Sequence, residues 1–223
     1  RWGVKARVAI GASMSIFDFV SDCAVCYLFW QSKNEENNES FFRAHLASLA
    51  SSLLIQLIVV WVNNWKIGIK TCLYESILVL TAFKPAFEAK RVALAEKRHS
   101  AKFTPDVEMT ITKCIELFAE AIPAVILQLM SLKVRKYREG GEIEMRFISL
   151  LSSALSTGFI CASISYDLDT DPKNRKTNPN FYGLVPANAT KRTIIFITIT
   201  FFSGTMLLIR ALTIVLLSFI NWK

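Results

Sequence analysis

The chain alternates between long uncharged stretches and short charged connections. Three uncharged runs are each about as long as one membrane crossing: 44–65, 147–166 and 193–209, the last resuming at 211–222 beyond Arg210. Two apolar runs, 8–30 and 111–132, contain charged residues, and the weakest run, 71–83, contains Glu75. All six runs are too long for barrel strands and lack period-two alternation, so we expect helices. The pattern predicts an all-α, polytopic transmembrane helical bundle of about six segments, in which the short 71–83 segment spans, tilts or re-enters.

The composition fits this class and excludes others. Of 223 residues, 52% are hydrophobic, which excludes a disordered chain, and five cysteines are too few for a disulfide scaffold. The formal net charge is +8, and its Lys and Arg lie mostly in the connections. With six crossings these cations divide 11 to 13 between the two sides, a balance that favours one segment not crossing fully. We therefore expect an integral, multi-pass membrane protein with a single transmembrane domain over 1–223, in a membrane that the sequence does not specify.

Acidic residues inside the apolar runs are the most informative feature. On insertion scales each charge costs about 2.5–3.5 kcal/mol at the bilayer centre. Asp18 and Asp22 are four residues apart and share one helix face, and Glu116 and Glu120 repeat this spacing. Two interpretations are open. The acids belong to a buried salt-bridge network that locks the bundle, or their surplus over nearby cations marks a hydrated groove, cavity or cation path.

The cations near these acids predict specific partners. Lys113 lies one turn before Glu116 on the same stripe, so we expect the two to pair. Glu120 is then left without a partner, and Arg210 or Lys84 is available to it.

A proline follows the second acid pair. Pro123 lacks a backbone donor and clashes with the carbonyl of Ala119, so we expect a helix kink beside Glu120 that exposes backbone polar groups. Gln128 follows near the edge of the same helix face.

The acid spacing belongs to a short internal similarity. Serines recur at matching places in the segment after each acid pair: 48, 51 and 52 in the first half, and 149, 152 and 153 in the second. Repeated halves are common in proteins that move substrates across membranes. We therefore expect halves at 1–106 and 107–223, with the two acidic helices facing each other at the centre.

At these residues the sequence resembles the XK-related family of membrane proteins, which includes phospholipid scramblases. The resemblance rests on Phe17-Asp18-Phe19-Val20-Ser21-Asp22 with Tyr27, on Ile115-Glu116-Leu117-Phe118-Ala119-Glu120-Ala121-Ile122-Pro123 followed by Leu127-Gln128-Leu129, and on Arg210. It implies a helical membrane fold and a polar furrow through which lipid headgroups pass while acyl tails stay in lipid.

The leading hypothesis is a protein that scrambles or binds membrane phospholipids. The candidate headgroup path consists of Asp18, Asp22, Glu75, Lys113, Glu116, Glu120, Gln128 and Arg210, with Pro123 as the kink. This function needs no cofactor, metal or covalent chemistry, so we expect no enzyme activity, and we expect no nucleic-acid partner. The alternatives are a non-catalytic transmembrane subunit of a larger membrane complex, with protein subunits as partners, and a cation channel or transporter that uses the excess carboxylates.

Overall fold

The computed structural model describes residues 2–31, 38–94, 102–134, 140–186 and 188–220. Within these ranges the chain is helical apart from turns and short connections, and no strand is present. This confirms the predicted all-α class. The elements are α1 (Trp2–Gln31), α2 (Asn38–Asn64), α3 (Ile69–Leu80), α4 (Lys84–Leu94), α5 (Pro105–Ile115), the π-helix η1 (Glu116–Ala121), α6 (Ile122–Val134), α7 (Gly140–Thr170), α8 (Pro172–Thr177) and α9 (Ala189–Ile220).

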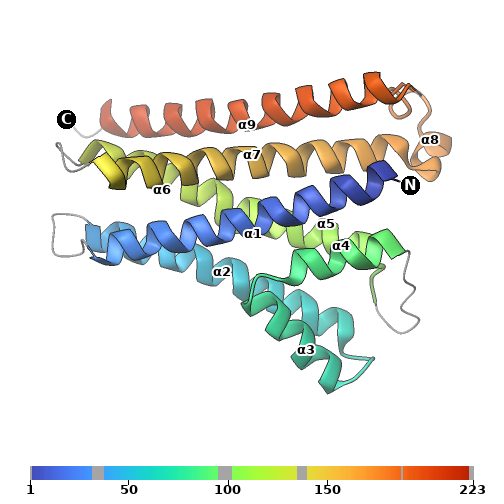
Figure 1. Cartoon of the computed structure of the whole chain (residues 1–223), viewed down its shortest axis with the longest axis horizontal. Helices are drawn as coiled ribbons and strands as arrows, with labels where there is room; N and C mark the ends of the chain where they lie inside the picture. Colours follow the sequence, from blue (N-terminus) through green and yellow to red (C-terminus); the bar gives the residue numbers. More distant parts are fainter. Residues whose placement is uncertain (1, 32–37, 95–101, 135–139, 187, 221–223) are drawn as a thin grey trace.

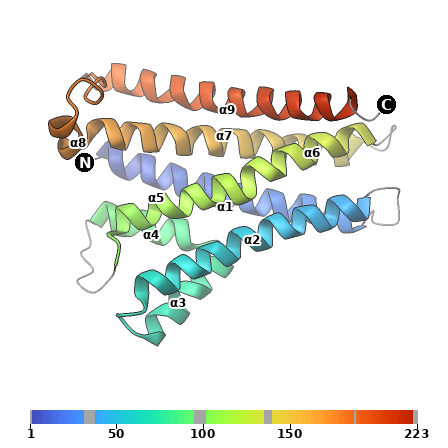
Figure 2. The same ribbon diagram turned by 180° about the vertical axis from the view of Figure 1, so that it is seen from behind.

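The long helices lie nearly side by side in an elongated bundle. In Figure 1, α9, α7, α1 and α2 follow one another from top to bottom. The continuous rod of α5, η1 and α6 crosses this layer diagonally on its other side, so that η1 lies over the middle of α1 (Figure 2). Its α5 end contacts α4, and its α6 end contacts α7 and α9.

Five helical stretches are long and apolar enough to cross a membrane: Ala9–Gln31, Glu39–Asn64, Val107–Ser131, Glu144–Thr170 and Ala189–Ser218. The sixth predicted segment is different. Helix α3 has 12 residues, or about 18 Å, well short of the roughly 30 Å of a hydrocarbon core. The chain reverses after it at Ala82, whose φ is 58°, and returns as α4. Helices α3 and α4 therefore form a short hairpin, which packs through α4 against α1 and through α3 against α2.

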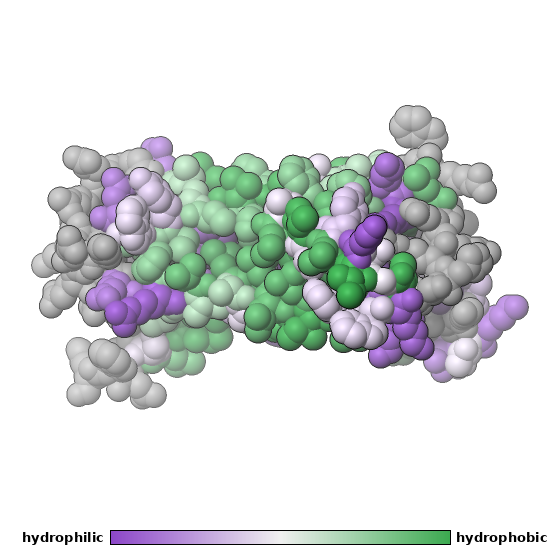
Figure 3. Space-filling model, turned by 90° about the horizontal axis from the view of Figure 1, so that it is seen from below, coloured by the Kyte–Doolittle hydropathy of each residue, from purple (hydrophilic) through white to green (hydrophobic). Residues whose placement is uncertain are grey.

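Polarity is inverted relative to a water-soluble protein. Large apolar side chains such as Phe17, Leu54 and Phe202 are more than half exposed, whereas Asp22, Glu75 and Gln128 are fully buried. Figure 3 shows an apolar band across the middle of one face, with hydrophilic residues gathered toward its two ends. Such a distribution is what apolar surroundings favour, because exposed apolar surface is then stable and polar groups must find partners inside.

The α7–α9 contact depends on two glycines. A Cβ on Gly158 would lie 2.1 Å from the carbonyl oxygen of Thr200, and one on Gly204 would lie 2.6 Å from that of Ala154. The helix backbones therefore approach as closely as small residues allow. This contact fixes which face of α9 turns toward the bundle.

We expect Gly158→Ala to lower stability by about 1–3 kcal/mol, because the added methyl group forces the α7 and α9 backbones apart. Thermal unfolding of the purified protein in detergent measures this, with Ile148→Ala on the exposed face of α7 as the control. A midpoint unchanged from that of the control would show that the two helices do not pack this closely.

Candidate functional site

Two separate polar clusters lie inside the bundle. The first, the acid–serine seam, joins carboxylates of α1 and η1 to neutral donors, and it comprises Ser15, Asp18, Asp22, Ser52, Gln56, Glu116, Glu120, Gln128, Ser149 and Ser153. The second, the ionic cluster, joins the α3–α4 hairpin to α5, and it comprises Glu75, Lys84, Glu88, Arg91 and Glu108.

The two acids of α1 are bound by α6 and α7. Ser153 donates its hydroxyl to Oδ1 of Asp18 at 2.7 Å. Ser149 donates to Oδ1 of Asp22 at 2.9 Å, and the amide of Gln128 donates to the same oxygen at 3.2 Å. Both aspartates are at most 8% exposed, so these hydroxyl and amide groups replace the hydration that the carboxylates lose.

The two acids of η1 are bound by α1 and α2. Ser52 donates to Oε2 of Glu120 at 2.9 Å and itself accepts a hydrogen bond from Gln56 at 3.3 Å. Ser15 donates to Oε2 of Glu116 at 3.1 Å, which brings the two acidic helices into direct contact.

Serines in each half of the chain bind acids in the other half. A serine of α2, the helix that follows the acids of α1 in sequence, binds Glu120 of η1, and serines of α7, which comes after η1, bind both acids of α1. A two-fold relation between 1–106 and 107–223 would produce this crossed arrangement. The repeat itself stays a prediction.

The second acid pair lies on a π-helical turn. The hydrogen bond that closes η1 runs from the amide of Ile122 to the carbonyl of Leu117, a wider register than in an α-helix. Pro123 follows directly and cannot donate to Ala119, and the freed Ala119 oxygen accepts a hydrogen bond from Ser48 at 2.6 Å. The sequence thus located both the irregularity and the exposed carbonyl, and the structure adds the donor that satisfies it.

The predicted cation partners of the second acid pair are wrong. Lys113 and Glu116 form no ion pair, because the Lys113 ammonium lies against Gly11 of α1 while Glu116 turns to Ser15. Lys113 is 6% exposed.

Nor does Glu120 pair with either cation proposed for it. Lys84 is held by three glutamates of the ionic cluster, and Arg210 is exposed on α9, which packs against α7 and α6. The hydrogen bonds to the carboxylates of the seam therefore come from neutral donors rather than from cations, and the second oxygen of Asp22, Oδ2, has no hydrogen-bond partner among the described residues.

A small cavity borders the seam where α1, α2 and η1 meet the α3–α4 hairpin. Its volume is about 20 Å³, room for about one water molecule. The carboxylates of Asp18, Glu116 and Glu120 line one side, and Lys84 lines another. A lipid headgroup does not fit into this space while the helices are packed as they are here.

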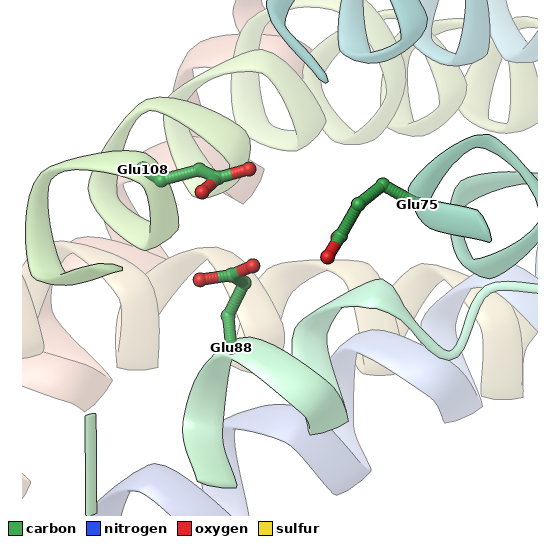
Figure 4. A group of neighbouring side chains, drawn as sticks. All are labelled: Glu75, Glu88 and Glu108. Carbon is green, nitrogen blue, oxygen red and sulfur yellow. The ribbon is translucent and has the colours of Figure 1, made fainter. Parts of the chain in front are cut away.

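The ionic cluster is fully internal. The ammonium of Lys84 donates to Glu75 at 2.7 Å, to Glu88 at 2.7 Å and to Glu108 at 2.6 Å, and Arg91 bridges Glu75 and Glu88. Figure 4 shows the three glutamates converging from α3, α4 and α5. Their oxygens lie within 4.8 Å of one another, a spacing that could hold a cation, and the Lys84 ammonium supplies that charge.

The cluster has three carboxylates and two cations, and the pKa values of Glu75 and Glu88 shift in opposite directions. Burial alone would raise the pKa of Glu75, but the hydrogen bond from Arg91 and the charge of Lys84 outweigh it and hold that pKa at about 2. Burial raises the pKa of Glu88, and although the charge of Lys84 opposes this shift, repulsion from Glu108 adds to it and the pKa stays raised. Glu88 therefore carries a proton more readily than Glu75.

The structure divides the predicted headgroup path. It brings Asp18, Asp22, Glu116, Glu120 and Gln128 together, whereas it places Glu75 in the ionic cluster, Lys113 beside Gly11, and Arg210 on the outer surface.

Sequence reasoning missed the roles of Glu88, Arg91 and Glu108. The i,i+4 spacing of Lys84 and Glu88 was a usable local signal for the first of these.

Comparison of the chain with models of protein families, with curated protein sequences and with solved structures gives no significant match. Inference about function therefore starts from the residues and geometry of the chain itself.

We expect Lys84→Met to destabilise the protein by about 3–5 kcal/mol, because it leaves three buried glutamates facing only Arg91. Thermal unfolding in detergent measures the loss. The matched control is Lys90→Met, which removes an exposed cation from the same helix and should leave the midpoint within a degree or two. Equal midpoints for the two variants would contradict an internal ionic cluster.

Proposed function

We propose that this chain is a multi-pass membrane protein that binds phospholipid headgroups in the acid–serine seam and lets them pass between leaflets. The observation that carries the proposal is the set of four carboxylates held inside an apolar bundle by hydroxyl and amide donors alone. Structural ion pairs would neutralise such acids permanently. Acidic side chains buried inside a membrane are expensive and characteristic of sites that receive a polar or cationic group.

Neutral hydrogen bonds also make the seam easier to open than an ionic lock. A neutral hydrogen bond contributes about 0.5–1.5 kcal/mol net to stability. When such a bond breaks, its donor is free to bind an incoming headgroup. Beside the seam, such bonds join α1 to α7, from Ser153 to Asp18 and from Ser149 to Asp22, while an ion pair between Arg7 and Asp167 joins the same two helices nearer the start of α1. The ionic cluster on the hairpin would stay fixed while α1 and α7 separate.

An apolar groove lies on the outer side of this contact. It has a volume of about 410 Å³, and its lining comes from α1 and α7: Ala9, Ile10, Ser13, Met14, Phe17, Ser152 and Leu155. Ser152, in this lining, is the chain neighbour of Ser153, which binds Asp18. The groove fits an acyl chain, so a lipid lying there would have its headgroup close to the α1 acids once the seam opens.

The proposed mechanism uses the acid–serine seam for the headgroup and the apolar groove for the acyl chain. The ammonium of a choline or ethanolamine headgroup meets the carboxylates, while serine hydroxyls and the Ala119 carbonyl region replace water around the rest of the headgroup. The acyl tails remain outside in lipid, and the barrier falls because the headgroup is never bare in hydrocarbon. The resemblance to XK-related proteins, which also carry charged residues in their membrane helices, supports the same proposal.

We expect Asp22→Asn and Glu120→Gln each to slow lipid exchange between leaflets by about tenfold, or about 1.4 kcal/mol in the barrier, because each removes a carboxylate that can attract the headgroup ammonium. Both replacements keep the oxygen that Gln128 or Ser52 binds, so folding should persist. The measurement is dithionite bleaching of fluorescent phosphatidylcholine in proteoliposomes.

Glu39→Gln is the control, since Glu39 is exposed and pairs only with Arg43 on its own helix. Exchange no faster than in empty liposomes would refute the proposal. Ion flux that depends on pH and occurs without lipid exchange would favour the cation path.

The hairpin also changes how the basic residues divide between the two sides of the membrane. With five crossings instead of six, 16 Lys and Arg of the connections lie on the side of the α1 N-terminal end, the α3–α4 hairpin and α8, against 8 on the other side. By the positive-inside rule this excess favours the hairpin side in the cytosol, and we propose that orientation.

We expect a glycan-acceptor segment inserted within 135–139 to be glycosylated in microsomes, and the same segment within 95–101 to stay unmodified, because only the first lies opposite the hairpin. The gel shift on glycosidase treatment measures this, and a version with Gln for the acceptor Asn is the control. The reverse pattern would invert the orientation.

A further inference from the structure

Arg210 is a charged residue on the outer surface of the bundle. Its side chain is exposed, and within the part of the chain that the structure describes it forms no hydrogen bond or ion pair. Its neighbours Ile209 and Leu212 are about half exposed and apolar, as is Ile214 one turn on. The cation therefore stands alone on an otherwise apolar face.

Arg210 also lies deep in its helix. The apolar stretch of α9 runs from residue 193 to residue 220, between Lys191-Arg192 and Trp222-Lys223, which mark the two membrane surfaces in the sequence. At a rise of about 1.5 Å per residue, Arg210 is roughly 5 Å from the midpoint of that stretch. A cation at this depth needs an anionic partner, because lipid tails supply none.

Helix α9 cannot turn Arg210 into the bundle. Gly204, Ala211 and Val215 are buried, and the close approach of Gly204 to Ala154 fixes this face against α7. Arg210 lies about a third of a turn away from that packed face. The partner must therefore approach from outside the described bundle.

The surface around Arg210 has the spacing of a helix–helix contact. Exposed or half-buried side chains recur at alternating intervals of three and four residues along one stripe of α9: Ser203, Met206, Arg210, Thr213 and Leu217. This is the spacing by which one helix packs along another, and small Ser and Thr side chains allow close approach in membranes. We call these five residues the α9 stripe.

We propose that the α9 stripe binds a transmembrane helix that carries an aspartate or glutamate at the depth of Arg210. A guanidinium and a carboxylate form two parallel hydrogen bonds, which suits a contact that excludes water. A second copy of this chain does not supply the acid, because α9 contains no Asp or Glu and two copies joined by the stripe would oppose their arginines. A lipid phosphate lies at the membrane surface and not near the midpoint.

The test uses the full chain in phosphatidylcholine vesicles, with a fluorescent donor at its end. The probe is an acceptor-labelled Leu/Ala helix of membrane-spanning length, flanked by lysines, with one glutamate near its middle. We expect it to bind about five- to tenfold more tightly than the same peptide with glutamine, as energy transfer over a range of peptide-to-lipid ratios would show. Arg210→Leu should abolish this preference, and Arg210→Glu should transfer it to a peptide with a central lysine.

Lys191→Leu, at the start of the same helix, is the matched control and should keep the glutamate preference. Unfolding midpoints show that each variant is folded, and an exposed site predicts little change. Equal binding of the glutamate and glutamine peptides would overturn the proposal, as would a preference that survives Arg210→Leu. Energy transfer between copies of the protein that Arg210→Leu removes would also overturn it, because the stripe would then bind the chain itself.

Discussion

Four carboxylates lie where apolar helices surround them, and each must find a hydrogen-bond donor inside the protein. Burial of an ionised carboxylate without such donors would cost more than the helix contacts supply. The donors come from helices distant in sequence: Ser149 and Ser153 bind the α1 acids, and Ser52 binds Glu120. These hydrogen bonds hold α2 against η1 and α7 against α1.

In the ionic cluster, buried carboxylates are bound by cations instead of neutral donors. There Lys84 and Arg91 bind the glutamates directly, and the hairpin is held to α5 by opposite charges at short distance. Removal of one partner leaves an uncompensated buried charge, so this part of the protein resists separation. In the seam the hydrogen bonds come instead from hydroxyl and amide groups, and the proposed headgroup would exchange with these donors. One bundle thus holds a fixed polar contact beside an exchangeable one.

The sequence was enough for the features that depend on neighbouring residues. Apolar runs located the spanning helices, the spacing of Asp18 and Asp22 located a polar face, and Pro123 located the freed carbonyl of Ala119. Spacing failed where a side chain bonded to another helix. Lys113 and Glu116 keep their i,i+3 relation in the α-helical register, but Glu116 accepts a hydrogen bond from Ser15 of α1 instead.

Local sequence patterns also could not predict contacts between residues that are distant in the sequence. The meeting of Glu75 with Arg91 depends on the reversal at Ala82, a residue with no sequence signal for a positive φ. In the same way, the exposure of Arg210 depends on how closely Gly204 lets α9 approach α7, which a hydrophobic run does not reveal.

The binding of acids by serines in the other half of the chain has a consequence for how the chain is made. Asp22 is hydrogen-bonded to a serine 127 residues further along, in α7. At 5–20 residues per second, that serine emerges from the ribosome on the order of ten seconds after the aspartate. During that interval α1 has no lasting place in lipid, so it must wait beside the insertion machinery or in its water-filled path. Insertion of the first helix is therefore completed late, by the fourth span to be synthesised, and the two parts of the chain are committed to the membrane together.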